Sequence, residues 1–470
     1  MTLSVVLVIA VIAGLYMAWN IGANDVANAM GTSVGSGALT LKQAVLLAAV
    51  FEFAGAFFIG GHVAQTIQKG IVDVDSLRAA ERSVESADPP AGPTGASRPA
   101  GPGVAPAETP SVASAPARSG DQGWWGASAA TNPRGHLKTQ LVMGMLAALI
   151  ASSIWLNVAT YFGQPVSTTH AIIGAVIGFA VVAAGVHAVV WSKMGTIALS
   201  WIISPLVGAA LAFVVYRLVQ KYVLSSRHPV FMARRALPVG VAAVTFIIAL
   251  SVIYHVLHLK PDVVLLSVPL ALMLAAIAAM ASWRMLGGSS GRRHVHRSQR
   301  YQLVERWFGR LQVMTACYMA FAHGANDVAN AIGPLGGIFH YAGGGTIEAK
   351  QAAVPLWLLA LGGVGIVIGL STYGYKVMAS IGKKITEITP TRGFAAEFGT
   401  ASTVLVCSLM GLPISTTFVL VGAVMGVGVA RGFGAIDLGV VRKIFASWLI
   451  TIPVSAVLSA GIYGLLMRFV

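Results

Sequence analysis

The sequence predicts an all-α polytopic membrane protein with about 12 transmembrane helices. Of its 470 residues, 56% are hydrophobic and only 10% are charged, and the mean hydropathy is +0.78. A soluble globular chain carries about 25% charged residues, so this composition excludes that class. Apolar stretches of about the 20 residues that a bilayer requires recur along the chain, and the alternating segments of a membrane β-barrel are absent from the pattern.

Twelve apolar segments are predicted to span the membrane. The first covers the N-terminal stretch, which has neither the charged start nor the small-residue cleavage site of a signal peptide, so we expect it to remain as a helix. The predicted spans are 2–20, 42–61, 139–157, 166–187, 194–216, 237–257, 263–283, 311–329, 352–372, 394–410, 414–430 and 444–466.

Residues 73–136 interrupt this pattern with one long polar segment. Its middle, from Pro89 to Pro116, contains eight prolines mixed with Ala, Gly and Ser. This composition cannot bury enough apolar surface to offset the entropy lost on ordering. We therefore expect residues 73–136 to form a disordered Pro/Ala-rich insert.

The positive charge is concentrated in loops. The formal net charge is +15, and residues 217–235 and 284–310 are the two most basic segments. Cytoplasmic loops collect Lys and Arg, and anionic lipids attract them, so the charge indicates a bilayer partner rather than nucleic acid. Counting spans from these loops places the N- and C-termini and the 73–136 insert outside. We expect a multi-pass protein of the cell membrane, inner or plasma.

The chain contains an internal repeat. The block Gly22–Ala29 recurs letter for letter as Gly324–Ala331, and Gly163–His170 returns with changes as Gly411–Phe418. The eighth predicted span corresponds to the first, and this odd shift reverses the direction of entry into the membrane. Two inverted-topology repeats are therefore expected, an arrangement common in secondary transporters. Residues 1–72 and 137–216 would form the first repeat, 217–310 two linking helices, and 311–470 the second repeat.

The first repeated block places carboxylates inside apolar segments. Asp25 and Asp327 hold matching positions in the two copies, and an ionisable residue within a membrane is costly enough to indicate function. A polar contact that only ties helices together is the alternative. The glycine-rich runs Gly31–Gly37 and Gly333–Gly337 are predicted to break the helices and line a cavity with freed backbone groups. The accompanying amides are Asn24, Asn28, Asn326 and Asn330.

The second repeated block predicts helix starts. A proline followed by hydroxyl side chains is typical of a first helical turn, and free N–H groups with nearby hydroxyls can bind an oxyanion. Ordinary packing of Ser and Thr between membrane helices is the alternative. The hydroxyl residues are Ser167, Thr168, Thr169, Ser415, Thr416 and Thr417.

The two blocks together predict cation-coupled anion symport. Two carboxylates beside an anion in a low dielectric would repel it, so cations or protons must enter with the anion. Asp25, Asp327, Asn28 and Asn330 are the candidate cation ligands. Glu52 and Glu397 lie in other apolar segments, as further coupling groups or as links between helices. His170 could donate to the anion, carry a proton or only pack, and its counterpart is Phe418.

Other function classes find little support in the pattern. The chain has no phosphate-binding glycine loop and no cluster of metal ligands in a polar domain, so no enzyme and no cofactor are expected. An ion channel would show a continuous polar stripe along its pore, which the apolar segments lack.

The paired Gly-Ala-Asn-Asp-Val-Ala-Asn-Ala and Pro-x-Ser-Thr-Thr blocks resemble those of the inorganic phosphate transporter (PiT) family. The resemblance implies symport of phosphate with Na⁺ or H⁺, or of a metal–phosphate complex, by a homodimer of inverted-repeat subunits. It implies that Asn24, Asp25, Asn326 and Asp327 hold phosphate and cations. It also implies that the two Ser-Thr-Thr groups bind phosphate. It also implies that Glu52 and Glu397 matter for transport. Phe418 departs from the family pattern, in which His is common, and a sulfate permease on the same scaffold remains the alternative.

Overall fold

The described part of the chain is almost entirely helical. A computed structural model describes residues 2–73, 76–77, 79, 133–162, 166–256, 261–287, 297–343, 354–374, 389–432 and 438–469. These residues form thirteen α-helices, and they contain no strand beyond one isolated bridge between Val72 and Val189. The helices are α1 (Leu3–Gly35), α2 (Leu41–Ile59), α3 (Gly61–Lys69), α5 (Pro133–Tyr161), α6 (Thr168–Ala184), α7 (Trp191–Val219), α8 (Pro229–Val256), α9 (Pro261–Gly287), α10 (Arg297–Ala342), α11 (Leu356–Gly369), α13 (Pro390–Leu409), α14 (Thr416–Arg431) and α15 (Leu438–Leu466).

The all-α membrane class is confirmed, while the predicted count of 12 helices is not. Each predicted span falls on one described helix, and α3 is an additional short helix that follows α2 after a single residue. Within the described residues, eight helical segments are long and apolar enough to cross a bilayer. The chain is therefore a multi-pass membrane protein.

Helices α6 and α14 are shorter than predicted. They have 17 and 16 residues, fewer than the roughly 20 that a full span requires. Each begins at a capping serine and ends at a glycine with positive φ, Gly185 at 80° and Gly432 at 120°. Each packs against the helix before it, α5 or α13, so each pair has the form of a hairpin.

The helix breaks predicted after the Asn-Asp blocks are confirmed in one copy and wrong in the other. Helix α1 runs through its block and ends at Gly35, inside the predicted run Gly31–Gly37, and Gly37 has a φ of 77°. Helix α10 continues through Pro334 and the whole second glycine run to Ala342. The glycines there serve packing, because a Cβ at Gly333 would lie 2.8 Å from the Ile67 side chain of α3.

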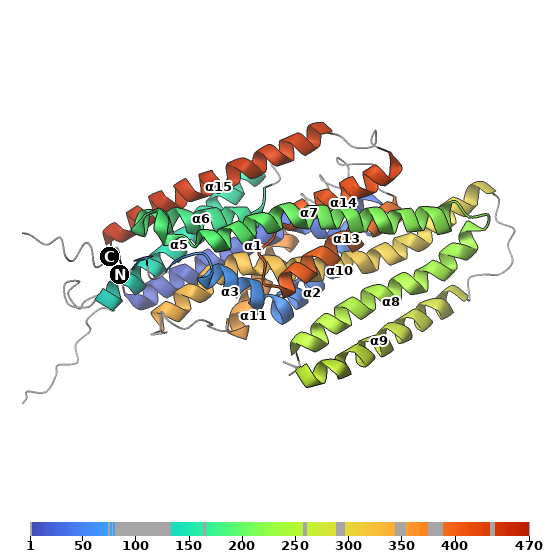
Figure 1. Ribbon diagram of the computed structural model, residues 1–470, viewed down its shortest axis with the longest axis horizontal. Helices are drawn as coiled ribbons and strands as arrows, with labels where there is room; N and C mark the ends of the chain where they lie inside the picture. Colours follow the sequence, from blue (N-terminus) through green and yellow to red (C-terminus); the bar gives the residue numbers. More distant parts are fainter. Residues whose placement is uncertain are drawn as a thin grey trace, which may run out of the picture.

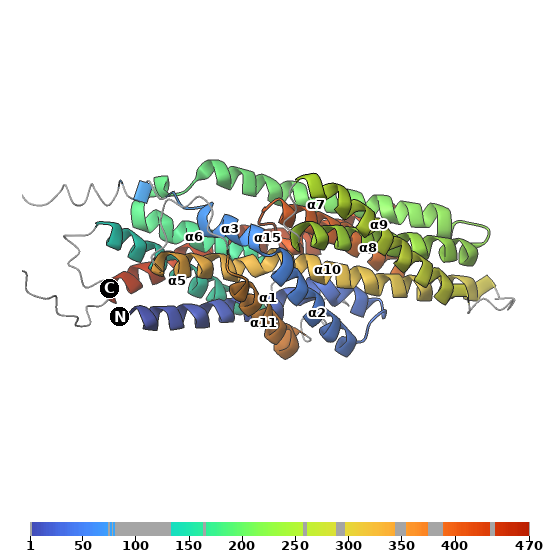
Figure 2. The same cartoon turned by 90° about the horizontal axis from the view of Figure 1, so that it is seen from below.

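The molecule is elongated, and its longest helices follow the long axis. Figures 1 and 2 show α7 and α10 running along much of its length, with α8 and α9 together on the outside. The ends of α7 and α9 that lead into the two basic loops lie at one end of the molecule, and both termini lie at the other (Figure 1). The two basic loops were predicted to share one side, and this placement agrees with that prediction.

Glycines bring helices of the two sequence copies into backbone contact. A side chain at Gly22 of α1 would collide with the carbonyl of Ile366 in α11, and one at Gly324 of α10 would collide with the carbonyl of Glu52 in α2. A second pair of contacts joins each hairpin to a helix of the other copy. Gly178 of α6 meets the backbone of Ala456 in α15, and Gly426 of α14 meets that of Ala209 in α7. In every case a helix of one copy packs against a helix of the other.

Two of the predicted segment boundaries can be compared with the described helices. Helix α10 begins at Arg297, so the predicted border between the linking segment and the second repeat at residues 310 and 311 falls inside a helix. The predicted insert lies almost wholly outside the described residues. At its start, the backbone N–H of Asp73 donates to the carbonyl of Ala188 over 2.8 Å.

Candidate functional site

Helices α6 and α14 begin at the two serines, as the sequence predicts. The Ser167 hydroxyl accepts a hydrogen bond from the His170 N–H at 3.2 Å, and the Ser415 hydroxyl accepts one from the Phe418 N–H at 3.4 Å. A capped helix start presents N–H groups and a positive dipole end to a ligand. The four threonines that follow the serines are all buried, namely Thr168, Thr169, Thr416 and Thr417.

The asparagines of each Asn-Asp block contact the helix start of the other copy. The Asn28 amide donates to the Thr417 hydroxyl at 2.8 Å. The Asn330 amide lies 3.2 Å from both the Thr168 and the Thr169 hydroxyl oxygens. These crossed contacts bring the two repeated blocks together at one buried place in the molecule.

The two aspartates contact the helix start of their own copy. The Thr416 hydroxyl donates to Asp327 Oδ2 at 2.8 Å, and the Thr168 side chain interacts with the Asp25 carboxylate. One oxygen of each carboxylate, Oδ2 of Asp25 and Oδ1 of Asp327, is buried without a hydrogen-bond partner. Together with the asparagine contacts, these bonds repeat between the two copies with the same pattern.

The first asparagines of the two blocks, Asn24 and Asn326, differ in their hydrogen bonds. The Asn326 amide donates to the Ser408 hydroxyl at 3.1 Å and to the Leu412 carbonyl at 3.3 Å, both next to the turn between α13 and α14. The Asn24 amide nitrogen is buried without a partner. Asn326 therefore supports the hairpin turn, while Asn24 keeps a free donor.

Sequence reasoning missed His323, which lies between two buried carboxylates. Its Nε2 is 2.8 Å from Asp327 Oδ2, and its Nδ1 is 3.2 Å from Glu52 Oε1; all three side chains are fully buried. Neither ring nitrogen has a hydrogen-bond partner, and both contacts are ion pairs when the imidazole is protonated. His323 is an ionisable residue in an apolar segment directly before the second Asn-Asp block, and that signal could have identified it. Through it, Glu52 is connected to the site.

Glu397 lies in a separate polar network. Its Oε1 accepts hydrogen bonds from Thr32 at 2.5 Å, Ser33 at 2.6 Å and Gln312 at 3.1 Å, and its Oε2 accepts one from Thr315 at 2.6 Å. These partners come from α1 and α10, whereas Glu397 is on α13. The network therefore links three helices through one fully buried carboxylate.

His170 is enclosed by aromatic rings. Its centroid lies 3.9 Å from that of Trp201 and 4.5 Å from that of Phe418, and neither of its buried ring nitrogens has a hydrogen-bond partner. Trp201 in turn donates to the Pro413 carbonyl at 3.0 Å, just before the start of α14. The structure thus places His170 at the contact between the two helix starts.

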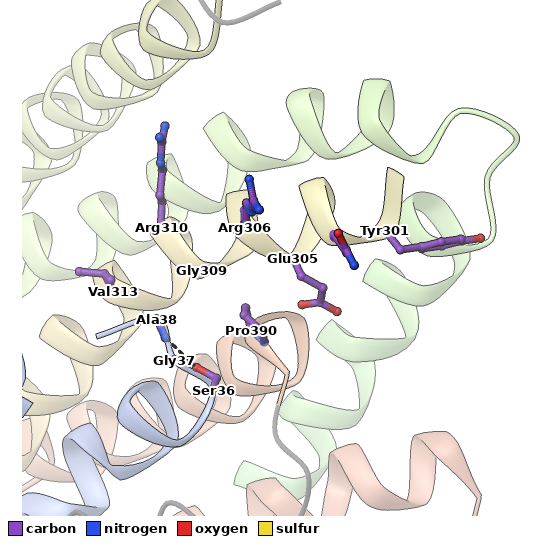
Figure 3. Close-up of a pocket in the computed structure, with 11 residues that line it drawn as sticks. Ser36, Gly37, Ala38, Tyr301, Glu305, Arg306, Gly309, Arg310, Val313 and Pro390 are labelled. Carbon is purple, nitrogen blue, oxygen red and sulfur yellow. Dashed lines mark hydrogen bonds between the residues drawn. The ribbon is translucent and has the colours of Figure 1, made fainter. Parts of the chain in front are cut away.

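A surface pocket of about 740 Å³ lies elsewhere, at the end of α10 that follows the basic loop. Figure 3 shows Arg306 and Arg310 pointing away from Pro390, while Glu305 turns toward the start of α13. The Glu305 carboxylate accepts bonds of 2.9 Å from both the N–H and the hydroxyl of Thr391. This pocket contains none of the repeated motif residues.

The buried site is rich in acceptors and poor in fixed positive charge. One ligand atom each from Asp25, His323 and Asp327 lies within 4.8 Å of the others. Among the residues whose side chains the structure describes, no Lys or Arg is buried. Two carboxylates about 5 Å apart repel each other by roughly 3 kcal/mol at an effective dielectric constant of 20. The arrangement can therefore hold cations, and the helix starts beside it can hold an oxyanion.

Comparisons with known proteins identify the family of this chain. The profile of the Phosphate transporter family matches residues 21–87 and 126–459. A protein of Pyrococcus abyssi that bears the provisional name of a phosphate permease is 42% identical over 463 residues, which cover 98% of each chain. The chloroplastic inorganic phosphate transporter 2-1 of Arabidopsis thaliana is 40% identical over 470 residues, 95% of this chain and 70% of that protein.

A solved structure extends the likeness to three dimensions. The structure titled "The sodium-dependent phosphate transporter" has 36% sequence identity to this chain and a TM-score of 0.81, and the match covers 99% of this chain and 100% of the other. The family profile, the relatives and the fold all lead to one assignment. The chain belongs to the phosphate transporter family.

Proposed function

We propose that the chain is a secondary active transporter that carries inorganic phosphate across the membrane together with sodium ions. The observation that carries the proposal is the meeting of both Asn-Asp blocks with both hydroxyl-bearing helix starts, through the contacts of Asn28 with Thr417 and of Asn330 with Thr168 and Thr169. The sodium dependence named for the similar solved structure favours sodium over protons.

In this proposal the two helix starts bind the anion. The hydroxyls of Ser167 and Ser415 accept from backbone N–H groups and keep their own protons for donation to phosphate oxygens. The dipoles of α6 and α14 add positive potential at the same place. Ser167, Thr168 and Thr169 of one copy and Ser415, Thr416 and Thr417 of the other are the proposed phosphate ligands.

Sodium ions balance the charge. The free oxygens of Asp25 and Asp327, with the side-chain oxygens of Asn24, Asn28, Asn326 and Asn330, are the hard ligands that such cations take. Without cations, the two carboxylates would repel the anion, since none of the Lys and Arg side chains that the structure describes is buried beside them. Glu52 contributes through His323, and Glu397 acts as a link among α1, α10 and α13.

The wider architecture follows the same proposal. The contacts that recur in equivalent form between the copies support two inverted repeats that rock against each other around the site. The helix ends that lead into the basic loops face the cytoplasm. Both termini lie at the opposite end of the molecule and are therefore on the outer side of the cell membrane (Figure 1). The subunits pair as homodimers. A sulfate permease finds no support in the relatives.

The test is uptake of labelled phosphate into proteoliposomes that contain the purified chain. A sodium gradient and a proton gradient are imposed separately, and sulfate is added as a competitor. We expect the sodium gradient alone to drive accumulation above equilibrium, with no inhibition by sulfate. Accumulation driven only by the proton gradient would show that protons, and not sodium ions, are the coupling ion. Uptake of sulfate in place of phosphate would show that phosphate is not the substrate.

A further inference from the structure

The surface pocket of about 740 Å³ beside α10 takes no part in the proposed transport. Its walls come from the turn after α1, which includes Ser36, from residues 301–313 of α10, and from Pro390 at the start of α13 (Figure 3). Pockets that bind small molecules commonly have volumes of about 300–1,000 Å³. This pocket is therefore large enough to hold a small ligand or a lipid headgroup.

The pocket lies where helices of the membrane region begin and end. Helix α1 ends at Gly35, directly before Ser36, and α13 begins at Pro390. The helix that follows the same turn, α2, has Leu46 and Val50 67% and 58% exposed, as expected for side chains that face lipid. In the proposed orientation, the pocket is therefore within reach of both the cytoplasm and the lipid headgroups of the inner leaflet.

Two arginines of the pocket have no partner in the protein. Arg306 and Arg310 both line the pocket, and both are exposed. Within the described part of the chain, neither side chain makes an ion pair or a hydrogen bond. Residues four apart on a helix have Cβ atoms about 5–6 Å apart, so the two guanidinium groups can contact one ligand. Figure 3 shows both side chains extending from α10 into open space, where they are free to turn toward a ligand.

The acid of the pocket does not neutralise these arginines. Among the described residues that line the pocket, Glu305 is the only acid. Its two carboxylate oxygens accept hydrogen bonds from the N–H and the hydroxyl of Thr391, each at 2.9 Å. Glu305 therefore joins α10 to the start of α13, and the arginines remain available. Gln302, exposed on the same wall, adds an amide donor.

The first copy of the repeat has no charge at the matching positions. In the alignment set by the Asn-Asp blocks, Arg306 corresponds to Ser4. Arg310 corresponds to Val8, which is 59% exposed. The fold therefore does not require arginine at these positions. The basic segment also has enough charge to orient the chain without them, in Arg284, Arg292, Arg293, Arg297 and Arg300.

We propose that this pocket binds a phosphate group on the cytoplasmic side of the membrane, with Arg306 and Arg310 as its ligands. The planar guanidinium group donates two parallel hydrogen bonds to phosphate oxygens. Like charges four residues apart on a helix repel each other, and an anion between them removes that repulsion. The phosphate is presented by the headgroup of an anionic phospholipid or by free phosphate, and the same contacts serve both sources.

A ligand in the pocket would reinforce the packing of three helices. The Ser36 hydroxyl, on the pocket wall after α1, donates to Gln312 Oε1 at 2.7 Å. The Gln312 amide of α10 donates in turn to Glu397 Oε1 of α13 at 3.1 Å. The pocket and the Glu397 network thus join the same helices. Because a ligand that binds only the folded chain stabilises it, we expect the bound phosphate group to raise the melting temperature.

The experiment measures binding to the purified, delipidated full chain in a neutral detergent. The first probe is phosphatidylglycerol in mixed micelles, with zwitterionic phosphatidylcholine for comparison. Native mass spectrometry counts the bound lipid, and intrinsic fluorescence follows melting. The second probe is inorganic phosphate without lipid. Since inorganic phosphate also acts at the proposed transport site, its effect is compared between the wild-type chain and arginine variants.

Variants identify the ligands of the phosphate group. The double change Arg306→Gln with Arg310→Gln is expected to weaken binding by about tenfold or more, because it removes hydrogen bonds from charged donors. Arg306→Lys with Arg310→Lys keeps the charge without the planar fork and should have an intermediate effect. The matched control, Arg227→Gln with Arg235→Gln, removes the same charge from exposed positions of the other basic loop and should bind normally.

The outcomes separate the two sources. Binding of phosphatidylglycerol that depends on Arg306 and Arg310 would identify the lipid headgroup. Stabilisation by inorganic phosphate that depends on the same arginines would identify free phosphate. A folded Gln variant that equals the wild-type chain toward both probes would overturn the site.

The phosphate pocket and the proposed function fail by different results. The pocket is tested by binding and melting in detergent, whereas the transport proposal fails if no gradient drives phosphate uptake into proteoliposomes. Either failure therefore leaves the other conclusion to be judged by its own measurement.

Discussion

His170 and Phe418 hold the same position in the two copies of the Pro-x-Ser-Thr-Thr block, and their rings meet nearly at a right angle with centroids 4.5 Å apart. Trp201 covers another side of the His170 ring at 3.9 Å. The starts of α6 and α14 therefore contact each other through an aromatic cluster. His170 differs from its counterpart chiefly by two ring nitrogens, and both are buried without partners.

The change His170→Phe is expected to raise the thermal stability of the purified protein. It removes two unsatisfied ring nitrogens and keeps a ring of similar size, and each such group costs about 1 kcal/mol or more. Melting of the protein in detergent, followed by intrinsic fluorescence, measures the effect. A lower melting temperature would show that the imidazole has a polar partner in the protein in solution.

The changes Asp25→Asn and Asp327→Asn are each expected to abolish concentrative phosphate uptake while the protein remains folded. Each amide removes one of the charges that the coupling cation balances, at nearly constant volume. Uptake is measured in proteoliposomes, and size-exclusion chromatography reports the fold. Glu305→Gln, which removes a carboxylate at the surface pocket, is the control and should transport normally. Normal transport by both Asp variants would contradict the cation-coupling argument.

The change Glu397→Leu is expected to lower the free energy of unfolding by about 3 kcal/mol or more. It leaves the hydroxyls of Thr32, Ser33 and Thr315 and the amide of Gln312 without their acceptor, and each unsatisfied buried group costs about 1–3 kcal/mol. Glu397→Gln retains an acceptor and should cost less. Thermal or denaturant unfolding of both variants gives the comparison, and equal stability of the two would refute the network's contribution.

The change Gly178→Ala is expected to separate α6 from α15 and to destabilise the protein by about 1–3 kcal/mol. The added methyl group would meet the backbone of Ala456, which cannot move aside as a side chain can. Gly461→Ala in α15 is the matched control, because nothing lies within 4 Å of its added Cβ. Alanine favours a helix there, so the melting temperature should stay the same or rise slightly. Equal melting temperatures for the two variants would contradict close packing at Gly178.

The sequence was informative where the signal is local. Capping serines and the residues after them predicted the starts of α6 and α14, because an N-cap bond forms within one turn. The same local reasoning was wrong for Pro334 and the glycines after it. In α10 these residues stay helical because α3 packs closely on Gly333. The free energy that Pro and Gly cost within this helix is smaller than the free energy gained by packing against the neighbouring helix.

The residues of the candidate site also fall into two groups, those that the sequence identified and those that only the structure revealed. The repeated blocks identified Asp25, Asp327 and the Ser-Thr-Thr residues, and the apolar surroundings identified Glu52 and Glu397. No spacing indicated that His323 contacts Glu52, because α2 and α10 are far apart in the chain. The backbone contacts that join these helices, at Gly55 and at Gly324, depend on how the two helices pack. The separate network around Glu397 was equally hidden, since its donors come from two other helices.

By itself, the sequence determined the membrane class, the helical composition, the repeated blocks and the presence of carboxylates within apolar segments. These properties follow from the cost of placing polar groups in hydrocarbon, which acts on each segment separately. The tertiary structure alone decided that the blocks of one copy contact the helix starts of the other and that His323 joins Glu52 to Asp327. Such pairings depend on the fit of whole helices, set here by glycines that admit a neighbouring backbone, and no local pattern encodes them.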